Sequence, residues 1–275
     1  MTFSRRALFS RLALYGIPTA TAGYSSTWEK NQLSVSEVTI PLEEKNRSLD
    51  GLKIALMADF HHDDFGSNAL IAQAVRTIND ADVDVVVLAG DYISRDLAPM
   101  TALCRELAAA KSRLGSFAVL GNHDCWHYHG DMPRMLADAG IQLLVDEHIA
   151  FDTFALAGIQ SVWGGRPNFQ ETISAVPRSL PILVALHEPD TFDDYQSDRV
   201  ILQVSGHTHG GQICAPFYGP IRLPAYGKRY PYGHYQKDNR SLFVTRGIGT
   251  LTIPARFLCP PELALLTLHV PALTA

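Results

Sequence analysis

Five apolar segments of this chain of 275 residues each end in side chains that can bind a metal ion. An apolar run that stops at polar residues is typical of a buried strand whose carboxyl end opens onto a site. Because parallel strands bring their carboxyl ends to the same edge of a sheet, the pattern predicts an open α/β fold with one site at that edge. The side chains at the five ends are Asp59 and His61, Asp91, Asn122 and His123, His187, and His207 and His209.

Each of these residues, taken alone, also has a purely structural explanation. Asp91 could cap a helix, Asn122 could occupy a turn, and His187 could be a core histidine with satisfied ring nitrogens. A histidine pair such as His207 and His209 also occurs by accident in surface loops. Five coincidences at the same place in the pattern favour a shared site over five separate explanations.

The residue types indicate a centre for two divalent metal ions. Carboxylates, an amide and imidazoles, without any thiolate, suit manganese, iron or zinc. Seven ligands are too many for one tetrahedral zinc ion, but they match two ions that share a bridging carboxylate. Two ions about 3.5–4 Å apart are the usual apparatus for displacement at phosphorus, with a hydroxide held between them as the attacking group.

The spacing of apolar residues predicts a layered α/β sandwich. Strands expected at 52–58, 83–89 and 117–120 alternate with a helix capped by Ser67 and a helix within 99–114, which indicates a parallel sheet with right-handed crossovers. The second half is less regular, as if a second sheet packed against the first. There we expect a short helix capped by Asp131 and strands at 141–145, 148–152, 154–159, 181–186, 200–204, 242–245 and 263–269.

The first 22 residues look like an export signal. The stretch Ser4-Arg5-Arg6-Ala7-Leu8-Phe9 resembles the twin-arginine motif, and a modestly apolar run follows up to Ala22. We expect cleavage after Ala22 and export by the twin-arginine machinery to the periplasm or cell envelope. The alternatives are a disordered basic tail on a cytoplasmic protein and an uncleaved membrane anchor. Beyond the signal, we expect a lead-in at 23–48 with an edge strand at 35–40, and one domain at 49–272.

Charge and cysteine content exclude two other classes of function. The formal net charge of −5 gives no electrostatic case for a nucleic-acid partner, which usually needs a basic patch. The four cysteines are scattered without C-x-x-C spacing, so we expect buried free thiols rather than a zinc knuckle or a disulfide framework. They are Cys104, Cys125, Cys214 and Cys259.

The motifs, taken in order, resemble those of the calcineurin-like metallophosphoesterases over roughly residues 50–270. The matching motifs are Asp59-x-His61, Gly90-Asp91, Gly121-Asn122-His123-Asp124, His187 and Gly206-His207-x-His209. A bacterial phosphodiesterase branch of that superfamily, whose members often carry twin-arginine signals, has further similar motifs. These are Gly206 to Gln212, Arg246-Gly247-Ile248-Gly249, Pro254-x-Arg256 and Pro261-Glu262.

The resemblance implies a four-layer αββα sandwich of two mixed sheets flanked by helices. It also implies hydrolysis of a phosphodiester by in-line attack of a hydroxide that bridges the two metals. The implied ligands are Asp59, His61 and His209 for the first metal, Asn122, His187 and His207 for the second, and Asp91 as the bridge. His123 would face the substrate, where it stabilises charge or protonates the leaving oxygen, and Asp124 would orient it.

Two places depart from the family pattern. His62, Asp63 and Asp64 stand where the family more often has an apolar residue and a glycine, and we expect a solvated polar loop there rather than a role beside the metals. Residues 161–165 have no acidic residue where many relatives place one, so we assign them no role. Arg166, Arg246 and Arg256 could hold a substrate phosphate or form structural ion pairs.

Two other functions remain as alternatives. One is a pyrophosphatase acting on a nucleotide-linked lipid precursor of the UDP-2,3-diacylglucosamine type, and the other is a non-catalytic metal-binding scaffold. The apolar stretch 213–226 bears on the substrate. We expect it to form a wall of the substrate cleft that meets a lipid-linked or membrane-held substrate, with packing over the core as the alternative.

Overall fold

The computed structural model describes residues 21–63, 65–127 and 130–272. The twin-arginine motif and the apolar run up to residue 20 lie outside the described residues, as does Asp64. The described chain begins with short helical turns, which include the π-helix η2 (Tyr24–Trp28) and the 3-10 helix η3 (Glu29–Asn31). Within the described residues, no helix is both long and apolar enough to cross a membrane.

The first sheet has six strands in the order β1-β14-β2-β3-β4-β5. Strands β2 to β5 run parallel, as the alternation of strands and helices predicts, whereas β14 is antiparallel to β2 and pairs in parallel with β1 at the edge. The strands are β1 (Ser34–Pro41), β14 (Glu262–His269), β2 (Lys53–Met57), β3 (Val85–Leu88), β4 (Gly115–Ala118) and β5 (Ile141–Leu143). Segments from both ends of the chain therefore lie side by side in one sheet.

The second sheet also has six strands, in the order β12-β13-β9-β8-β7-β6. Its four central strands are parallel, and both edge strands are antiparallel to their neighbours. The strands are β12 (Gly233–Lys237), β13 (Arg240–Val244), β9 (Val200–Ser205), β8 (Ile182–Ala185), β7 (Ala155–Gly158) and β6 (Glu147–Ala150). A separate short hairpin joins β10 (Cys214–Ala215) to β11 (Gly219–Pro220).

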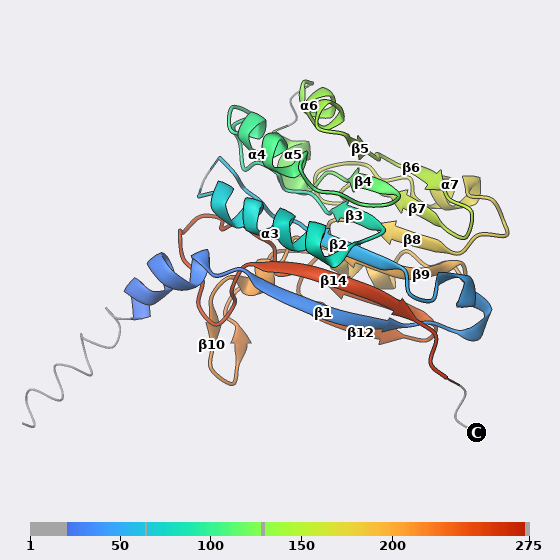
Figure 1. Ribbon diagram of the computed structural model, residues 1–275. Helices are drawn as coiled ribbons and strands as arrows, with labels where there is room; N and C mark the ends of the chain where they lie inside the picture. Colours follow the sequence, from blue (N-terminus) through green and yellow to red (C-terminus); the bar gives the residue numbers. More distant parts are fainter. Residues whose placement is uncertain (1–20, 64, 128–129, 273–275) are drawn as a thin grey trace, which may run out of the picture.

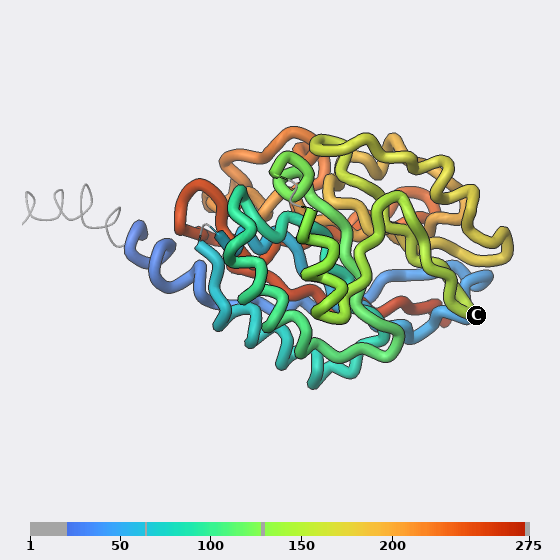
Figure 2. The backbone as a smooth tube through the Cα atoms, turned by 90° about the horizontal axis from the view of Figure 1, so that it is seen from above, coloured from blue at the N-terminus to red at the C-terminus, as the bar shows by residue number. Residues whose placement is uncertain are grey.

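The sheets pack face to face and helices cover their outer faces, so the expected four-layer sandwich is confirmed. Leu56 and Val87 of the first sheet share one apolar core with Leu183 and Val204 of the second. Figure 1 shows α3 and α4 lying over the first sheet, and Figure 2 shows the yellow and orange second half of the chain along the other side of the molecule. The helices on the first sheet are α3 (Asn68–Ala81), α4 (Met100–Leu107) and α6 (Met132–Asp138), and those on the second are α7 (Phe169–Ala175) and the 3-10 helix η5 (Pro189–Asp193).

The end of one helix and the capping of another differ from those expected. Helix α4 ends at Leu107 rather than near residue 114. The Asn79 side chain on α3 holds the segment that follows, since its amide donates to the Ala109 carbonyl (3.0 Å) and its oxygen accepts from the Lys111 amide (2.7 Å). Asp131 makes no cap hydrogen bond to α6, and its carboxylate pairs instead with Arg134 at 3.1 Å. Ser67 does cap α3, accepting from the Leu70 amide.

Several short elements had no clear signal in the sequence. They include the helices α5 (Asn122–Trp126) and α7, the strand β12, the β10–β11 hairpin and the 3-10 helices η4 (Glu44–Leu49) and η6 (His209–Gly211). Helix α5 has the sequence NHDCW, which shows no apolar periodicity from which a helix could be predicted.

Candidate metal centre

The segments that follow the carboxyl ends of five strands carry the residues expected at the site, and both sheets contribute. They are Asp59 and His61 after β2, Asp91 after β3, Asn122 and His123 after β4, His187 after β8, and His207 and His209 after β9. The structure brings the ligand-type carboxylates and imidazoles among them into two adjacent buried groups. One group is Asp59, His61 and His209, and the other is Asp91, His187 and His207.

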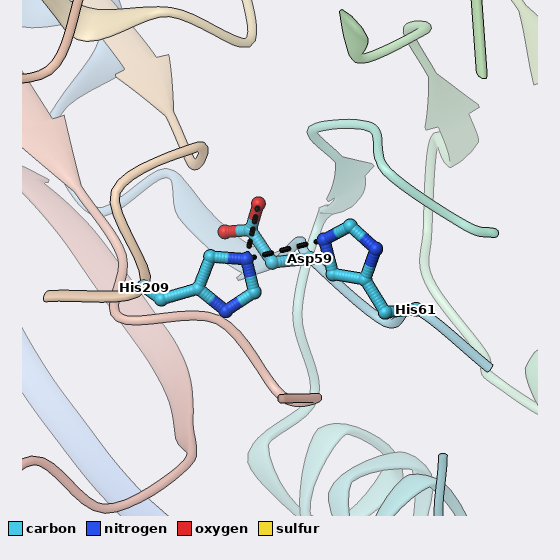
Figure 3. A group of neighbouring side chains, drawn as sticks. All are labelled: Asp59, His61 and His209. Carbon is cyan, nitrogen blue, oxygen red and sulfur yellow. Dashed lines mark hydrogen bonds and ion pairs between the residues drawn. The ribbon is translucent and has the colours of Figure 1, made fainter. Parts of the chain in front are cut away.

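In the first group, three side chains from two separate loops converge (Figure 3). The Nε2 atoms of His61 and His209 lie 3.1 Å apart, and Asp59 Oδ1 lies 3.8 Å from His209 Nε2. The backbone amide of His207 donates to both oxygens of Asp59, at 2.9 and 3.0 Å. The loop after β9 therefore fixes the Asp59 carboxylate, while its own histidines enter both groups.

Asp91, a member of the second group, also lies close to the first. Its Oδ2 atom is 3.4 Å from His61 Nε2 in the first group and 3.2 Å from His187 Nε2 in the second. The other oxygen, Oδ1, accepts a hydrogen bond from the His123 backbone amide at 3.0 Å. One carboxylate oxygen thus faces both groups of imidazoles, which is the position that a bridging ligand needs.

Hydrogen bonds orient three of the imidazoles so that one ring nitrogen stays directed at the centre. His187 Nδ1 donates to the Ala89 carbonyl at 2.6 Å, and His207 Nε2 donates to the Ala225 carbonyl at 2.7 Å. His61 Nδ1 lies 3.0 Å from the Ser94 hydroxyl. A metal-binding histidine commonly uses its second nitrogen in this way, which fixes both the tautomer and the ring orientation.

Burial and charge set the protonation of these groups. Burial lowers the pKa of His61 to about 4 and that of His209 well below its usual value, so both rings are neutral near pH 7, as metal ligands must be. Burial alone would raise the pKa of Asp91, but His187 and His61 hold it below the usual range. Burial would lower the pKa of His187, but Asp91 beside it raises this pKa well above the usual value. The charges of His187 and Asp91 therefore stabilise each other.

The backbone is strained where the ligand-type residues stand. Left-handed backbone costs a residue other than glycine roughly 1–2 kcal/mol. Five such residues adopt it here: Asp59 (φ 56°), His61 (φ 40°), Asp91 (φ 56°), His207 (φ 74°) and His209 (φ 52°). Strain gathered at one site is typical of a functional centre held in place by the surrounding structure.

Asn122 and His123 open helix α5 beside the two groups. Asn122 Oδ1 is buried and has no hydrogen-bond partner among the described residues, so it is available to an ion. The His123 ring packs edge-on against His61, with ring centroids 4.9 Å apart, and its Nδ1 donates to the Ser94 carbonyl at 3.1 Å. Its other ring nitrogen is left for the cleft.

Asp124 does not orient His123, so that expectation is wrong. The Asp124 carboxylate is buried and accepts hydrogen bonds from the backbone amides of Asp91, Tyr92 and Gly121, at 2.7–2.9 Å. Asp124 therefore holds the loop after β3 against the start of α5. The group that orients His123 is the Ser94 carbonyl, which sequence motifs did not reveal.

We expected a solvated polar loop at residues 62–64, but Asp63 is half-buried and hydrogen-bonded. Its carboxylate accepts hydrogen bonds from the backbone amides of Ser94, Arg95 and Asp96, at 2.5, 2.7 and 2.8 Å. Ser94 contacts both His61 and His123, so Asp63 supports the centre through the loop that carries Ser94.

Arg246 and Arg256 are structural. Arg256 is fully buried and donates to backbone carbonyls around the site, including those of His209, Gly247 and Gly249. Arg246 pairs with Glu262 at 2.8 Å.

Gly247 and Gly249 pack directly against the Asp59 loop. A Cβ atom on Gly249 would lie 2.0 Å from the Phe60 carbonyl oxygen, and one on Gly247 would lie 2.6 Å from Asp59 Cβ. The glycines of this motif therefore permit a close backbone approach that shapes the site.

A cleft of about 930 Å³ opens beside the two groups. Asp91, Asn122 and His123 line it, as do the half-exposed rings of Trp126 and Trp163. Trp126 packs on His123 and Trp163 packs on His207, with ring centroids 5.1 and 5.6 Å apart. Trp163 thus contributes to the cleft, although we assigned no role to residues 161–165.

Part of the apolar stretch 213–226 also lines the cleft, as expected. The residues of this stretch that line the cleft are Ile213, Ile221, Arg222, Leu223, Pro224 and Ala225. Phe217 and Tyr218 do not line it. They stand at the tip of the β10–β11 hairpin with exposed side chains, so the alternative of packing over the core is wrong for them.

The four cysteines are free, as expected. Cys104, Cys214 and Cys259 are buried, and Cys125 is half-buried.

Comparisons with known proteins agree with this geometry. The family model described as "Calcineurin-like phosphoesterase" matches residues 52–211. The chain is 32% identical to the uncharacterized metallophosphoesterase YkuE of Bacillus subtilis, over 90% of this chain and 89% of the relative. It is 31% identical to the phosphodiesterase YaeI of Escherichia coli, over 78% of this chain and 82% of the relative.

Two more distant likenesses extend the comparison. The chain is 24% identical to the UDP-2,3-diacylglucosamine pyrophosphatase LpxG of Chlamydia trachomatis, over 94% of this chain and 95% of the relative. A crystal structure of a putative 5'-nucleotidase from Staphylococcus aureus shares the fold with a TM-score of 0.50 and 11% identity, covering 81% of this chain and 55% of that one.

Proposed function

Because the chain belongs to the calcineurin-like phosphoesterase family, we propose that it is a phosphodiesterase that uses two divalent metal ions. The single observation that supports this most is the position of Asp91, whose Oδ2 atom faces imidazoles of both groups. Manganese, iron and zinc are the candidate ions, because the ligand-type atoms are imidazole nitrogens, carboxylate oxygens and one amide oxygen. When bound, the pair supplies Lewis acidity and the nucleophile for in-line attack on phosphorus.

The residues of this chain fit such a pair. In our proposal Asp59, His61 and His209 would hold the first ion, His187, His207 and Asn122 would hold the second, and Asp91 would bridge them. The unpartnered buried Asn122 Oδ1 supports its place in this set, since a buried polar atom normally has a partner. The hydrogen bonds on the far sides of the His61, His187 and His207 rings support theirs.

His123 acts on the substrate rather than on the metals in this proposal. The Ser94 carbonyl accepts from its Nδ1, which keeps a proton on that nitrogen and leaves Nε2 to serve the leaving oxygen or its developing charge. The backbone amide of His123 also donates to Asp91, which fixes the position of His123 relative to the proposed bridging carboxylate.

We propose an amphiphilic phosphodiester as the substrate class. The cleft combines the apolar wall of residues 213–226 with two cationic side chains, Arg222 and Lys228, that suit phosphate oxygens. A pyrophosphatase reaction on a nucleotide-linked lipid is the second candidate, favoured by the likeness to LpxG. A non-catalytic scaffold is disfavoured, because every ligand position of the motif is filled.

We propose that the protein works outside the cytoplasm after export by the twin-arginine route. The Arg5-Arg6 motif and the apolar run behind it support this. A cytoplasmic location is the alternative, and the LpxG-type reaction would favour it.

Asp91→Asn tests the proposed centre. Removing the shared negative charge should lower the bound metal from about two ions to one or none per chain and abolish turnover of bis(p-nitrophenyl) phosphate. Metal content by mass spectrometry and turnover after reconstitution with manganese, iron or zinc measure both effects. Asp138→Asn, which alters an exposed carboxylate far from the centre, is the matched control and should change neither.

A substrate panel on the wild-type protein separates the candidate functions. Phosphodiesterase activity predicts turnover of diesters well above that of p-nitrophenyl phosphate and of UDP-linked lipids. A preference for the UDP-linked lipid would favour the pyrophosphatase, and two bound metals without any turnover would favour the scaffold.

A further inference from the structure

We propose that the protein docks on the surface of a lipid bilayer through an apolar rim beside the cleft. The rim consists of the exposed side chains of three neighbouring segments, which are Tyr24 and Trp28, Phe217, Tyr218 and Ile221, and Ile253 and Leu258. Binding to the bilayer through the rim does not depend on any catalytic activity. Its consequence for turnover rests on the proposed phosphodiesterase function.

The tip of the rim is more exposed than a folded protein normally leaves an aromatic pair. Phe217 is 112% exposed and Tyr218 is 79% exposed. The φ angle of Phe217 is +64°, a conformation that glycine or asparagine adopts more readily, so a phenylalanine is a poor choice for the turn itself. Figure 1 shows the hairpin labelled β10 projecting from the body of the molecule. An apolar tip on a projecting hairpin is suited to insertion between lipid headgroups.

Contacts around Phe257 join the three segments into one surface. The Cys214 amide, at the base of the hairpin, donates to the Phe257 carbonyl at 2.9 Å. The ring of Tyr24 meets the ring of Phe257 edge-on, with centroids 6.4 Å apart, and Leu258 follows directly. The Gln212 side chain donates to the Ile253 carbonyl at 3.0 Å, which ties the third segment to the start of the hairpin.

The charge of the rim fits an anionic lipid surface. The chain as a whole has a formal net charge of −5, yet residues 21–28, 213–228 and 246–261 contain no aspartate or glutamate. Arg222 and Lys228 lie in this region, line the cleft and form no ion pair with a described residue. Uncompensated cations beside apolar and aromatic side chains attract anionic headgroups.

The relation of the rim to the cleft favours a bilayer over a protein as the occupant. Ile221 and Ile253 belong to both, because each is exposed at the rim and also lines the cleft. A protein partner or a second copy seated on the rim would close the mouth of the cleft. A lipid surface would instead present amphiphilic phosphodiesters directly to it.

Sedimentation with vesicles tests the docking without any substrate. The full chain is mixed with vesicles of phosphatidylcholine alone and of phosphatidylcholine with an equal part of phosphatidylglycerol. Phe217→Ser with Tyr218→Ser should lower the vesicle partition coefficient by about tenfold or more, because two apolar rings are lost. Phe217→Trp with Tyr218→Trp is the matched control and should retain binding. Because all variants share the apolar run of residues 12–22, the difference reports the rim alone.

A charge variant and a measurement of mass complete the test. Arg222→Gln with Lys228→Gln should remove most of the gain that phosphatidylglycerol gives. Equal vesicle binding by the serine and tryptophan variants would overturn the proposal. So would a wild-type dimer that the serine variant splits into monomers in sedimentation velocity, since the rim would then bind a second copy.

Turnover distinguishes a failure of the docking from a failure of the proposed function. The serine variant should keep its turnover of bis(p-nitrophenyl) phosphate in solution, because Phe217 and Tyr218 do not line the cleft. It should lose turnover of a phosphodiester lipid held in vesicles. If the wild type binds vesicles through the rim but cleaves no lipid phosphodiester, the docking stands and the proposed substrate class is wrong.

Discussion

Some residues around the centre face the cleft, whereas others are buried and hold the backbone that carries the ligand-type residues. His123 and Asp124 are neighbours in the sequence, but they fall on opposite sides of this division. His123 faces the cleft with its ring oriented by the Ser94 carbonyl, whereas Asp124 is buried and accepts three short backbone hydrogen bonds. Replacing His123 should therefore lower activity, whereas replacing Asp124 should lower stability.

His123→Ala should lower kcat by about 10²–10⁴-fold while both metal ions stay bound, because a general acid is lost and no ligand is removed. The loss should be smaller for nitrophenyl esters than for alkyl esters, since nitrophenolate departs with little protonation. Steady-state kinetics across leaving groups and metal analysis measure this. His127→Ala, one helical turn away with its ring centroid 6.5 Å from that of His123, is the control and should leave kcat unchanged.

Two results would contradict this assignment. Metal lost in proportion to activity would make His123 a ligand. A loss of equal size for good and poor leaving groups would assign it to charge stabilisation rather than proton donation.

Asp124→Asn should reduce the free energy of unfolding by about 2–3 kcal/mol, because one carboxylate oxygen that accepts from backbone amides becomes an amide donor. Chemical denaturation measures the change, and Asp138→Asn, at an exposed position, should shift it by less than about 0.5 kcal/mol. The dependence of kcat on the leaving group should stay as in the wild type. A changed dependence would restore Asp124 to the role of orienting His123.

At the scale of elements, the site depends on close packing between loops from different strands. The loop after β13 carries Gly247 and Gly249, which lie against the loop after β2, and the buried Arg256 ties the carbonyls of both glycines and of His209 together. This packing holds Asp59 and His61 in left-handed backbone conformations. A larger side chain at Gly247 or Gly249 should therefore lower metal affinity more than it lowers the stability of the fold.

Gly249→Ala should lower metal affinity and activity, because the added Cβ would lie 2.0 Å from the Phe60 carbonyl oxygen and must displace that loop. Metal titration and thermal unfolding separate the two effects. Gly140→Ala is the matched control, since its Cβ would meet nothing within 4 Å but its φ of +73° makes alanine strained. The control should lose about 1–2 kcal/mol of stability and keep its metals. Unchanged metal affinity in Gly249→Ala would contradict this prediction, because the loop at Phe60 would then accommodate the added Cβ without any effect on the site.

At the scale of the whole molecule, the N-terminal segment is part of the folded structure from Tyr24 onward. The Arg256 amide donates to the Ser25 carbonyl at 3.0 Å, the Cys259 amide donates to the buried Glu29 carboxylate at 2.6 Å, and β1 then pairs with β14 along its length. Cleavage after Ala22 would leave all of these contacts in place.

Replacing Arg5 and Arg6 with lysine should retain the protein in the cytoplasm, because the twin-arginine machinery reads the arginine pair. Cell fractionation and N-terminal sequencing measure location and processing, with a mature wild-type protein expected to begin near Gly23. Normal export of the double-lysine variant would exclude the twin-arginine route, and a mature protein that still starts at residue 1 would support an uncleaved anchor.

The sequence alone determined the chemistry of the site and the class of the fold. Apolar runs that end in Asp59, Asp91 or His187 predict strands and site together, because the period of side-chain burial and the residue at the strand end are both local properties. The motif Gly206-His207-x-His209 indicates a metal site only together with these runs, because a histidine pair alone also occurs by accident in surface loops. The strands of both sheets that carry ligand-type residues were predicted within a few residues of their observed bounds.

Only the tertiary structure decided which groups support and surround those residues. Ser94, Asp63 and Trp163 act through contacts between loops that are far apart in the chain, and no local pattern encodes such contacts. The same reason explains why Asp124 holds the loop after β3 rather than the ring next to it, and why α4 stops where Asn79 holds the following segment. The period of apolar residues predicts which side chains of one helix or strand are buried. The hydrogen-bond partner of a buried polar group depends on how several elements pack together.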